Sequence, residues 1–127
     1  MGVLKLRNRL VSIVLLVIFL VSCATSKAIP WVEFNKLTVI SQPNSDSYYP
    51  LESKKLGEEG KVVVILLVNE GGRVEIAAPG RNPSPYIALN TAAYELARNF
   101  VFKPYEVNGL PTKFFTTVMI TFELSKK

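Results

Sequence analysis

The sequence contains no histidine, one cysteine and one aspartate among its 127 residues. With one cysteine no internal disulfide can form, and without histidine the usual zinc clusters are excluded. The adjacent carboxylates of Glu58 and Glu59 lie beside Gly57 and Gly60, where solvated turn charge is expected rather than an acid and base couple. No phosphate-binding G-x-x-x-x-G-K-[ST] motif occurs. We therefore expect no enzyme, no cofactor and no metal site.

Positive charge is concentrated near the start of the chain. Lysine and arginine number 15 against 10 acidic residues, and three of these cations, Lys5, Arg7 and Arg9, precede an apolar run at residues 10–21. Without these three cations the excess of positive charge falls from 5 to 2. The remaining basic residues are scattered, so we expect no nucleic acid partner, which would need a basic footprint.

The first 22 residues have the pattern of an export signal: a basic start, a short apolar run and small residues at its end. The run at residues 10–21 is shorter than the roughly 17 to 25 residues that a membrane-spanning helix needs. An uncleaved signal anchor is the alternative, because the uncharged stretch continues to Ser26.

The only cysteine lies at the end of this run. Leu20, Val21, Ser22 and Cys23 resemble the lipobox of bacterial lipoproteins. The resemblance implies that Cys23 receives a diacylglyceryl group, that the chain is cleaved before it, and that the new amino terminus is acylated. Such a residue would hold the protein on its membrane, since stable anchoring needs at least two acyl chains. Ala24 follows instead of aspartate, which favours the outer membrane over the inner one.

Residues 23–47 connect this lipidated terminus to a domain that we expect at residues 48–127. The connection carries Trp31, Val32, Phe34 and Leu37, and it is too apolar for a flexible linker. It predicts an additional strand or a segment packed on the domain. A polar loop is expected at residues 42–47.

The expected domain begins with two β-branched apolar runs within residues 61–78. They flank the turn signal at residues 69–72 and predict a β-hairpin. The first run is apolar at every position, as expected for a central strand. A helix should follow, capped by Ser84 with Pro85 in its first turn. Its apolar positions at helical spacing are Leu89, Ala92, Ala93, Leu96 and Phe100.

Residues 113–124 alternate between apolar and more polar positions, which predicts a strand with one buried face. The apolar set is Phe114, Val118, Ile120, Phe122 and Leu124. The order strand, strand, helix, strand predicts an α+β fold, in which a small antiparallel three-stranded sheet packs on one main helix.

The spacing of glycines, prolines and apolar residues resembles a known family. Residues 49–74 read Y-P-x-x-S-x-x-x-G-x-x-G-x-V-x-V-x-L-x-V-x-x-x-G-x-V, and Phe102, Pro104, Gly109 and Pro111 fit F-x-P-x-x-x-x-G-x-P. Both patterns resemble the C-terminal domain of TonB, the periplasmic energy transducer. The resemblance spans residues 49–124. It implies a binding domain whose last strand lies at a sheet edge and pairs with a short motif of an outer-membrane transporter.

Carried onto this chain, the resemblance places the binding edge at residues 113–123, with residues 46–49 near the partner. The implied contact residues are Asp46, Ser47, Tyr48, Tyr49, Lys113, Phe115, Thr117, Met119, Thr121 and Glu123. Many relatives have glutamine where this chain has Asp46. The sequence leaves open whether residues 29–40 cover the same edge.

The chain departs from a standard transducer, which has a transmembrane helix and a long proline-rich linker. We expect a lipid-anchored TonB-like module that faces the periplasm and docks an outer-membrane transporter or another TonB-like protein. A homodimer through exposed strand edges is a further expectation. The alternatives are a working energy transducer with an uncleaved anchor and a structural envelope lipoprotein.

Overall fold

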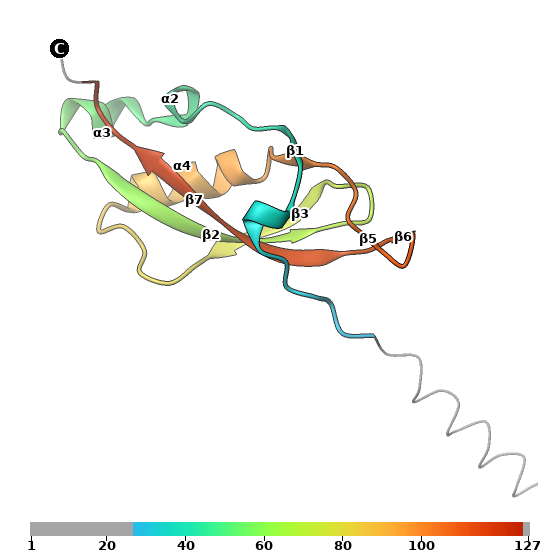
Figure 1. Ribbon diagram of the computed structural model, residues 1–127. Coiled ribbons are helices and arrows are strands. Elements are labelled where there is room, and N and C mark those ends of the chain that lie inside the picture. Colours follow the sequence, from blue (N-terminus) through green and yellow to red (C-terminus); the bar gives the residue numbers. More distant parts are fainter. Residues whose placement is uncertain (1–26, 126–127) are drawn as a thin grey trace, which may run out of the picture.

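A computed structural model describes residues 27–125 of the chain (Figure 1). The expected signal peptide at residues 1–22 and the expected lipidation site at Cys23 lie outside these residues. Among the described residues no helix is long and apolar enough to span a membrane. The elements are η2 (Phe34–Lys36), β1 (Val39–Ser41), α2 (Ser45–Tyr48), α3 (Leu51–Lys55), β2 (Gly60–Val68), β3 (Val74–Pro79), α4 (Ile87–Ala97), β4 (Val101–Phe102), β5 (Glu106–Val107), β6 (Leu110–Pro111) and β7 (Phe114–Phe122).

The three long strands form one antiparallel sheet in the order β3-β2-β7, and α4 packs against it. This arrangement confirms the predicted α+β fold and the central place of the first strand. Short two-stranded ladders, β1 with β4 and β5 with β6, lie beside this sheet.

Side chains alternate strictly along β7 and, up to Leu66, along β2, where Leu67 is buried as well. The even-numbered residues from Val62 in β2 and from Phe114 in β7 are buried on the face that packs on α4, and Thr116 joins the predicted apolar set there. Phenylalanines dominate the core because four of them, Phe100, Phe102, Phe114 and Phe122, have 2% exposure or less. Phe102 stacks on Phe100 and lies edge-on to Phe114, while Phe122 lies edge-on to Tyr49, as aromatic groups prefer.

The predicted hairpin is present, and a side-chain hydrogen-bond network holds its turn. The Asn69 Oδ1 atom accepts hydrogen bonds from the N–H groups of Gly71 and Arg73, both at 3.0 Å. Gly72 has φ +81° and its carbonyl accepts a hydrogen bond of 2.9 Å from the N–H of Phe102. This close approach ties the turn to β4.

The predicted start of the long helix is wrong. The helix α4 begins at Ile87 with Tyr86 as its N-cap residue, which makes no side-chain capping bond. The Ser84 hydroxyl instead accepts a hydrogen bond of 3.1 Å from the N–H of Tyr86 in the preceding turn, and the Asn90 side chain bonds both the N–H and the C=O of Ser84. The serine therefore organises the approach to the helix rather than its first turn.

Two short helices are not predicted from the sequence, and the first, α2, overlaps the polar loop expected at residues 42–47. The N-cap residue of α2 is Asn44, whose Oδ1 accepts a hydrogen bond of 3.0 Å from the N–H of Asp46. Pro50 is the N-cap residue of α3. Each helix is too short to show helical periodicity in its sequence.

The apolar segment before residue 42 packs on the domain, as predicted, and β1 is the expected additional strand. Val32 belongs to the core, and the Phe34 ring lies edge-on to Phe100 and Phe102 with ring centres 6.5 and 6.2 Å apart. Trp31 forms a parallel bridge with Phe115 of β7. The segment therefore crosses the outer edge of β7.

We expect Gly72→Ala to lower the free energy of unfolding by about 3 kcal/mol or more, because left-handed strain and a steric clash add. A β-carbon there would lie 1.9 Å from the carbonyl oxygen of Phe102. Gly109→Ala is the matched control: its φ is +76° but nothing lies within 4 Å, so strain alone should cost about 1 kcal/mol. Urea unfolding followed by circular dichroism measures both. Equal losses would contradict the importance of the close approach.

Candidate partner-binding edge

The strand β7 is an outer strand of the sheet, and the start of its free side is occupied by the chain itself. The N–H of Phe115 donates to the carbonyl of Pro30 at 2.9 Å, and the N–H of Val32 donates to the carbonyl of Phe115 at 2.8 Å. Both backbone groups of Phe115 therefore point away from β2. The sequence left open whether residues 29–40 cover the binding edge. In the structure, residues 30–32 cover it at Phe115.

The rest of this side is open. Backbone groups of an antiparallel strand alternate in direction, so Thr117, Met119 and Thr121 present their N–H and C=O groups to the same side as Phe115. Within residues 27–125 no backbone group pairs with them. We call residues 117–121 the open edge.

The side chains of the open edge alternate as the sequence predicts. Thr117 and Met119 are exposed on the sheet face away from α4, and Thr121 is half-buried there. Val118 and Ile120 are buried on the opposite face. A strand docked on this edge would therefore meet Met119 and the threonines on one face of the sheet.

A groove of ≈ 210 Å³ adjoins the open edge, and we call it the edge groove. Its strand side is formed by Met119, Ile120 and Thr121. The opposite wall comes from two other segments: residues 42–45, which lead into α2, and Leu96 of α4. These wall residues could not be found from the sequence, because three separate segments meet there only in the folded chain.

A second hollow of ≈ 740 Å³, the acidic hollow, lies where β7 ends. It brings together three of the predicted contact residues, Asp46 and Tyr49 from one segment and Glu123 from a distant part of the sequence. The other lining residues are Lys54, Glu59, Leu124 and Ser125. Three carboxylates against one ammonium group make the hollow attractive to a cation.

Tyr49 is the buried residue of the acidic hollow's lining. Its hydroxyl donates a hydrogen bond to the carbonyl of Glu58, and its ring lies edge-on to Phe122 with ring centres 5.2 Å apart. Burial raises the pKa of Tyr49, and the nearby carboxylates of Glu59 and Glu58 raise it further. The hydroxyl therefore remains a hydrogen-bond donor at neutral pH.

The neighbouring predicted residues differ in their surroundings. The Tyr48 hydroxyl accepts a hydrogen bond of 3.0 Å from Asn99 Nδ2, and its ring packs at the border of the core. Ser47 is exposed. Of residues 46–49, Asp46 and Tyr49 thus line the hollow.

Lys113 lies apart from the open edge. Its Nζ atom is 3.0 Å from Glu75 Oε2, and Glu75 belongs to β3, on the far side of β2. The hydrogen bond to Glu75 raises the pKa of Lys113. Both groups are partly exposed, so this ion pair adds little stability.

The described residues contain no group of three acidic, histidine or cysteine side chains that could hold a metal ion. What residues 117–121 offer is a row of unpaired backbone donors and acceptors, which is the chemistry of strand addition.

Comparisons with known proteins agree with the fold. Residues 45–124 match the family model described as Gram-negative bacterial TonB protein C-terminal. The solution NMR structure of the Pseudomonas aeruginosa TonB C-terminal domain is similar, with a TM-score of 0.62 and 18% sequence identity. The match covers 76% of this chain and 96% of that chain, and at this identity it shows a shared fold. No curated protein matches the chain.

A pair of proline variants tests the direction of the backbone groups in β7. Thr117→Pro removes an N–H that points away from β2, which an outer strand tolerates. Val118→Pro removes a donor to β2 and leaves a buried carbonyl unpaired, so we expect it to cost at least about 2 kcal/mol more. Urea unfolding compares the two. A larger loss for Thr117→Pro would contradict the assigned direction.

Proposed function

This chain belongs to the family of TonB C-terminal domains, and from that membership we propose that it is a lipid-anchored module that faces the periplasm and docks an envelope partner. The family consists of non-enzymatic protein-interaction modules of the cell envelope. The proposed partner is an outer-membrane transporter or another TonB-like protein. The proposed contact is an extended segment that adds to the sheet beside β7.

The single observation that carries this proposal is the open edge. Unpaired backbone groups at Thr117, Met119 and Thr121 can form a new ladder, in which main-chain hydrogen bonds supply affinity and side chains adjust specificity. Proteins normally block such edges to avoid aggregation. Here residues 30–32 block the edge at Phe115 alone.

The dimensions favour a short motif. Residues 117–121 span roughly 13 Å at the rise of an extended strand, which matches a partner segment of about five residues. One side of that segment would face the edge groove and the other would lie beside Met119 on the exposed sheet face. Residues 30–32 limit the ladder at one end.

The acidic hollow favours a basic residue at one end of the partner motif. Asp46, Glu59 and Glu123 surround the place where the ladder would leave β7. Complementary charge at such a rim increases the rate of association and fixes the register more than it adds affinity. The predicted role of Asp46 and Glu123 is therefore selection of the partner.

The proposed anchor is Cys23. Trp31 follows eight residues later, a distance of roughly 29 Å at most when fully extended. The binding edge would therefore remain close to the membrane. Ala24 after the cysteine favours the outer membrane, and the uncharged stretch up to Ser26 supports the alternative of an uncleaved anchor and a working energy transducer.

Intact mass of the protein from its own membranes tests the anchor. We expect a chain that begins at Cys23 and carries acyl groups, because the lipobox directs both cleavage and acylation. Cys23→Ala should remain unprocessed. A full-length wild-type chain without acyl groups would contradict the lipid anchor and support the transducer with an uncleaved segment.

Binding of synthetic peptides tests the open edge. Peptides from the periplasmic segments of outer-membrane transporters should bind saturably, and Met119→Pro should weaken binding by about tenfold, since it removes one donor and introduces a clash. Glu123→Gln should weaken basic peptides more than neutral ones. Calorimetry measures these affinities.

The control is Ile87→Ala, an exposed position at the start of α4 and outside the sheet, which should bind like the wild type. Equal binding by wild type and Met119→Pro would exclude strand addition at this edge. If instead the protein alone forms a dimer that Met119→Pro disrupts, the occupant of the edge is a second copy of the chain.

A further inference from the structure

The sheet has a second surface that the edge-binding proposal does not use. Odd-numbered residues of β2 and β7 point away from α4, and cross-strand partners share a face. The ladder pairs Val63 with Met119, Leu67 with Phe115 and Leu67 with Ile76. We call this surface the outer face. Its apolar members are Val63, Ile65, Leu67, Ile76, Ala78, Phe115, Met119 and the adjoining Trp31.

The outer face is partly exposed. Leu67 is buried and Val63, Ile65, Ala78 and Phe115 are half-buried, whereas three members are open to solvent. Trp31, Met119 and Ile76 have exposures of 63%, 60% and 53%. Among the described residues no helix covers this side, because α4 packs its buried positions against the inner face. Single exposed apolar residues are ordinary, but a continuous patch marks an interaction site.

Trp31 is fixed on this patch. Its indole stacks on the Phe115 ring with ring centres 5.0 Å apart and an angle of 23°. The backbone of Pro30 and Val32 is bonded to Phe115 on either side. The tryptophan is therefore held in place and still exposed, which is the arrangement of an anchor residue rather than of a core residue.

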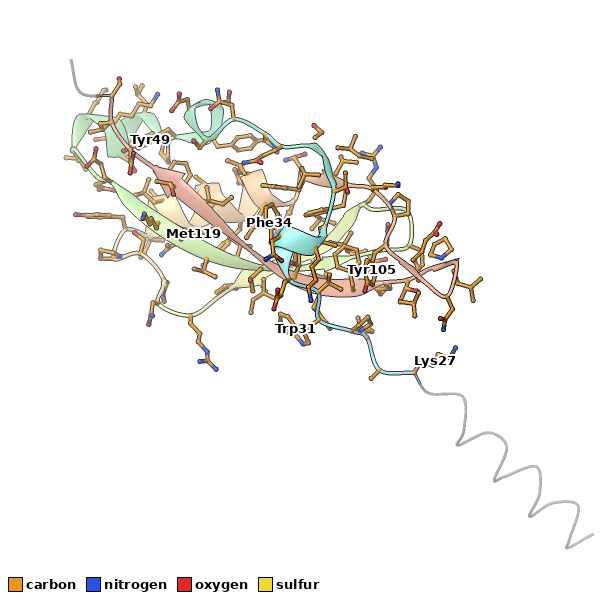
Figure 2. The ribbon with its side chains drawn as sticks, in the orientation of Figure 1. Lys27, Trp31, Phe34, Tyr49, Tyr105 and Met119 are labelled. Carbon is orange, nitrogen blue, oxygen red and sulfur yellow. The ribbon has the colours of Figure 1, made fainter. Side chains whose placement is uncertain are left out.

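The path of the chain indicates what covers the outer face. Figure 2 shows Trp31 below the strands, and the chain continues to Lys27 on that same side. Cys23 lies four residues before Lys27, so it lies within roughly 14 Å of Lys27 even when fully extended. An acylated Cys23 would thus bring the membrane to the side where Trp31 is exposed.

We propose that the outer face lies on the lipid surface that holds Cys23, with Trp31 at the level of the headgroups. This inference rests on the proposed acylation. Tryptophan prefers the boundary between headgroups and acyl chains, where its ring is buried and its N–H stays hydrated. Lys27 and Lys61, the second on the outer face opposite Thr121, supply cations for anionic headgroups.

This placement has a consequence for the edge. The open edge borders the outer face at Met119, so a docked segment would run along the membrane surface. The edge groove adjoins the same stretch of strand, since Met119, Ile120 and Thr121 line it. A partner segment that emerges at the membrane would then reach the edge without crossing the periplasm.

The fluorescence of Trp31 tests the proposal directly, because it is the only tryptophan in the chain. The acylated protein, purified from its membranes, is placed in vesicles of phosphatidylethanolamine and phosphatidylglycerol that contain nitroxide-labelled phosphatidylcholine. We expect a blue shift and loss of most of the emission, with stronger quenching by a label near the headgroup than by one deep in the chains. Emission that neither label quenches would overturn the proposal.

Two variants provide the matched comparison. Ile76→Glu puts a charge on the outer face and should restore much of the Trp31 emission, whereas Ile87→Glu puts the same charge on α4, where the native residue is 80% exposed, and should leave the quenching unchanged. Equal quenching in both variants would overturn the proposal. A blue-shifted, unquenched emission that depends on protein concentration would also overturn it, by assigning the face to a second copy.

Intact mass of each sample separates the two proposals. A chain without acyl groups would overturn both the proposed anchor and this inference, because both depend on acylation of Cys23. An acylated chain whose Trp31 stays unquenched would overturn the membrane-facing surface alone. Binding of the peptide to the protein on these vesicles tests the open edge independently of either result.

Discussion

The register of β7 against β2 is the constraint on which the rest of the structure depends. Phe114 and Phe122, the first and last residues of β7, are both fully buried and pair with the two ends of β2. A shift of one residue would expose both rings and bury Met119. The same shift would turn the outward backbone groups toward β2. The alternation of residues along β7 therefore fixes both the packing of the core and the backbone groups of the open edge.

The amino-terminal segment adds a second constraint. Its bonds to Phe115 begin a fourth strand beside β7 and stop after one bridge. Val32 then enters the core, and the partly exposed Phe34 ring lies edge-on to Phe100 at its border, so the chain leaves the strand. An edge that could accept a long ladder is thereby reduced to residues 117–121. The segment both stabilises the domain and sets the length of what can bind.

The parts of the fold that follow from local periodicity could be predicted from the sequence. The alternation of residues 114–122 and the turn around Asn69 each reflect interactions between near neighbours. The start of α4 could not be predicted, because Asn90 competes for the backbone of Ser84. The edge groove could not be predicted from the sequence either. Its walls come from three segments, and only tertiary packing brings Leu96 opposite Met119.

The position of the anchor limits the functions that this edge can serve. With acylation at Cys23, as proposed, the connection to Trp31 has a reach of roughly 29 Å, far less than a long linker would provide. A lipid in one leaflet also offers no transmembrane helix through which a motor could apply force. A short tether and a short edge both favour docking of a segment already present at the membrane surface. Both limits therefore favour binding of a partner segment over transmission of force to it.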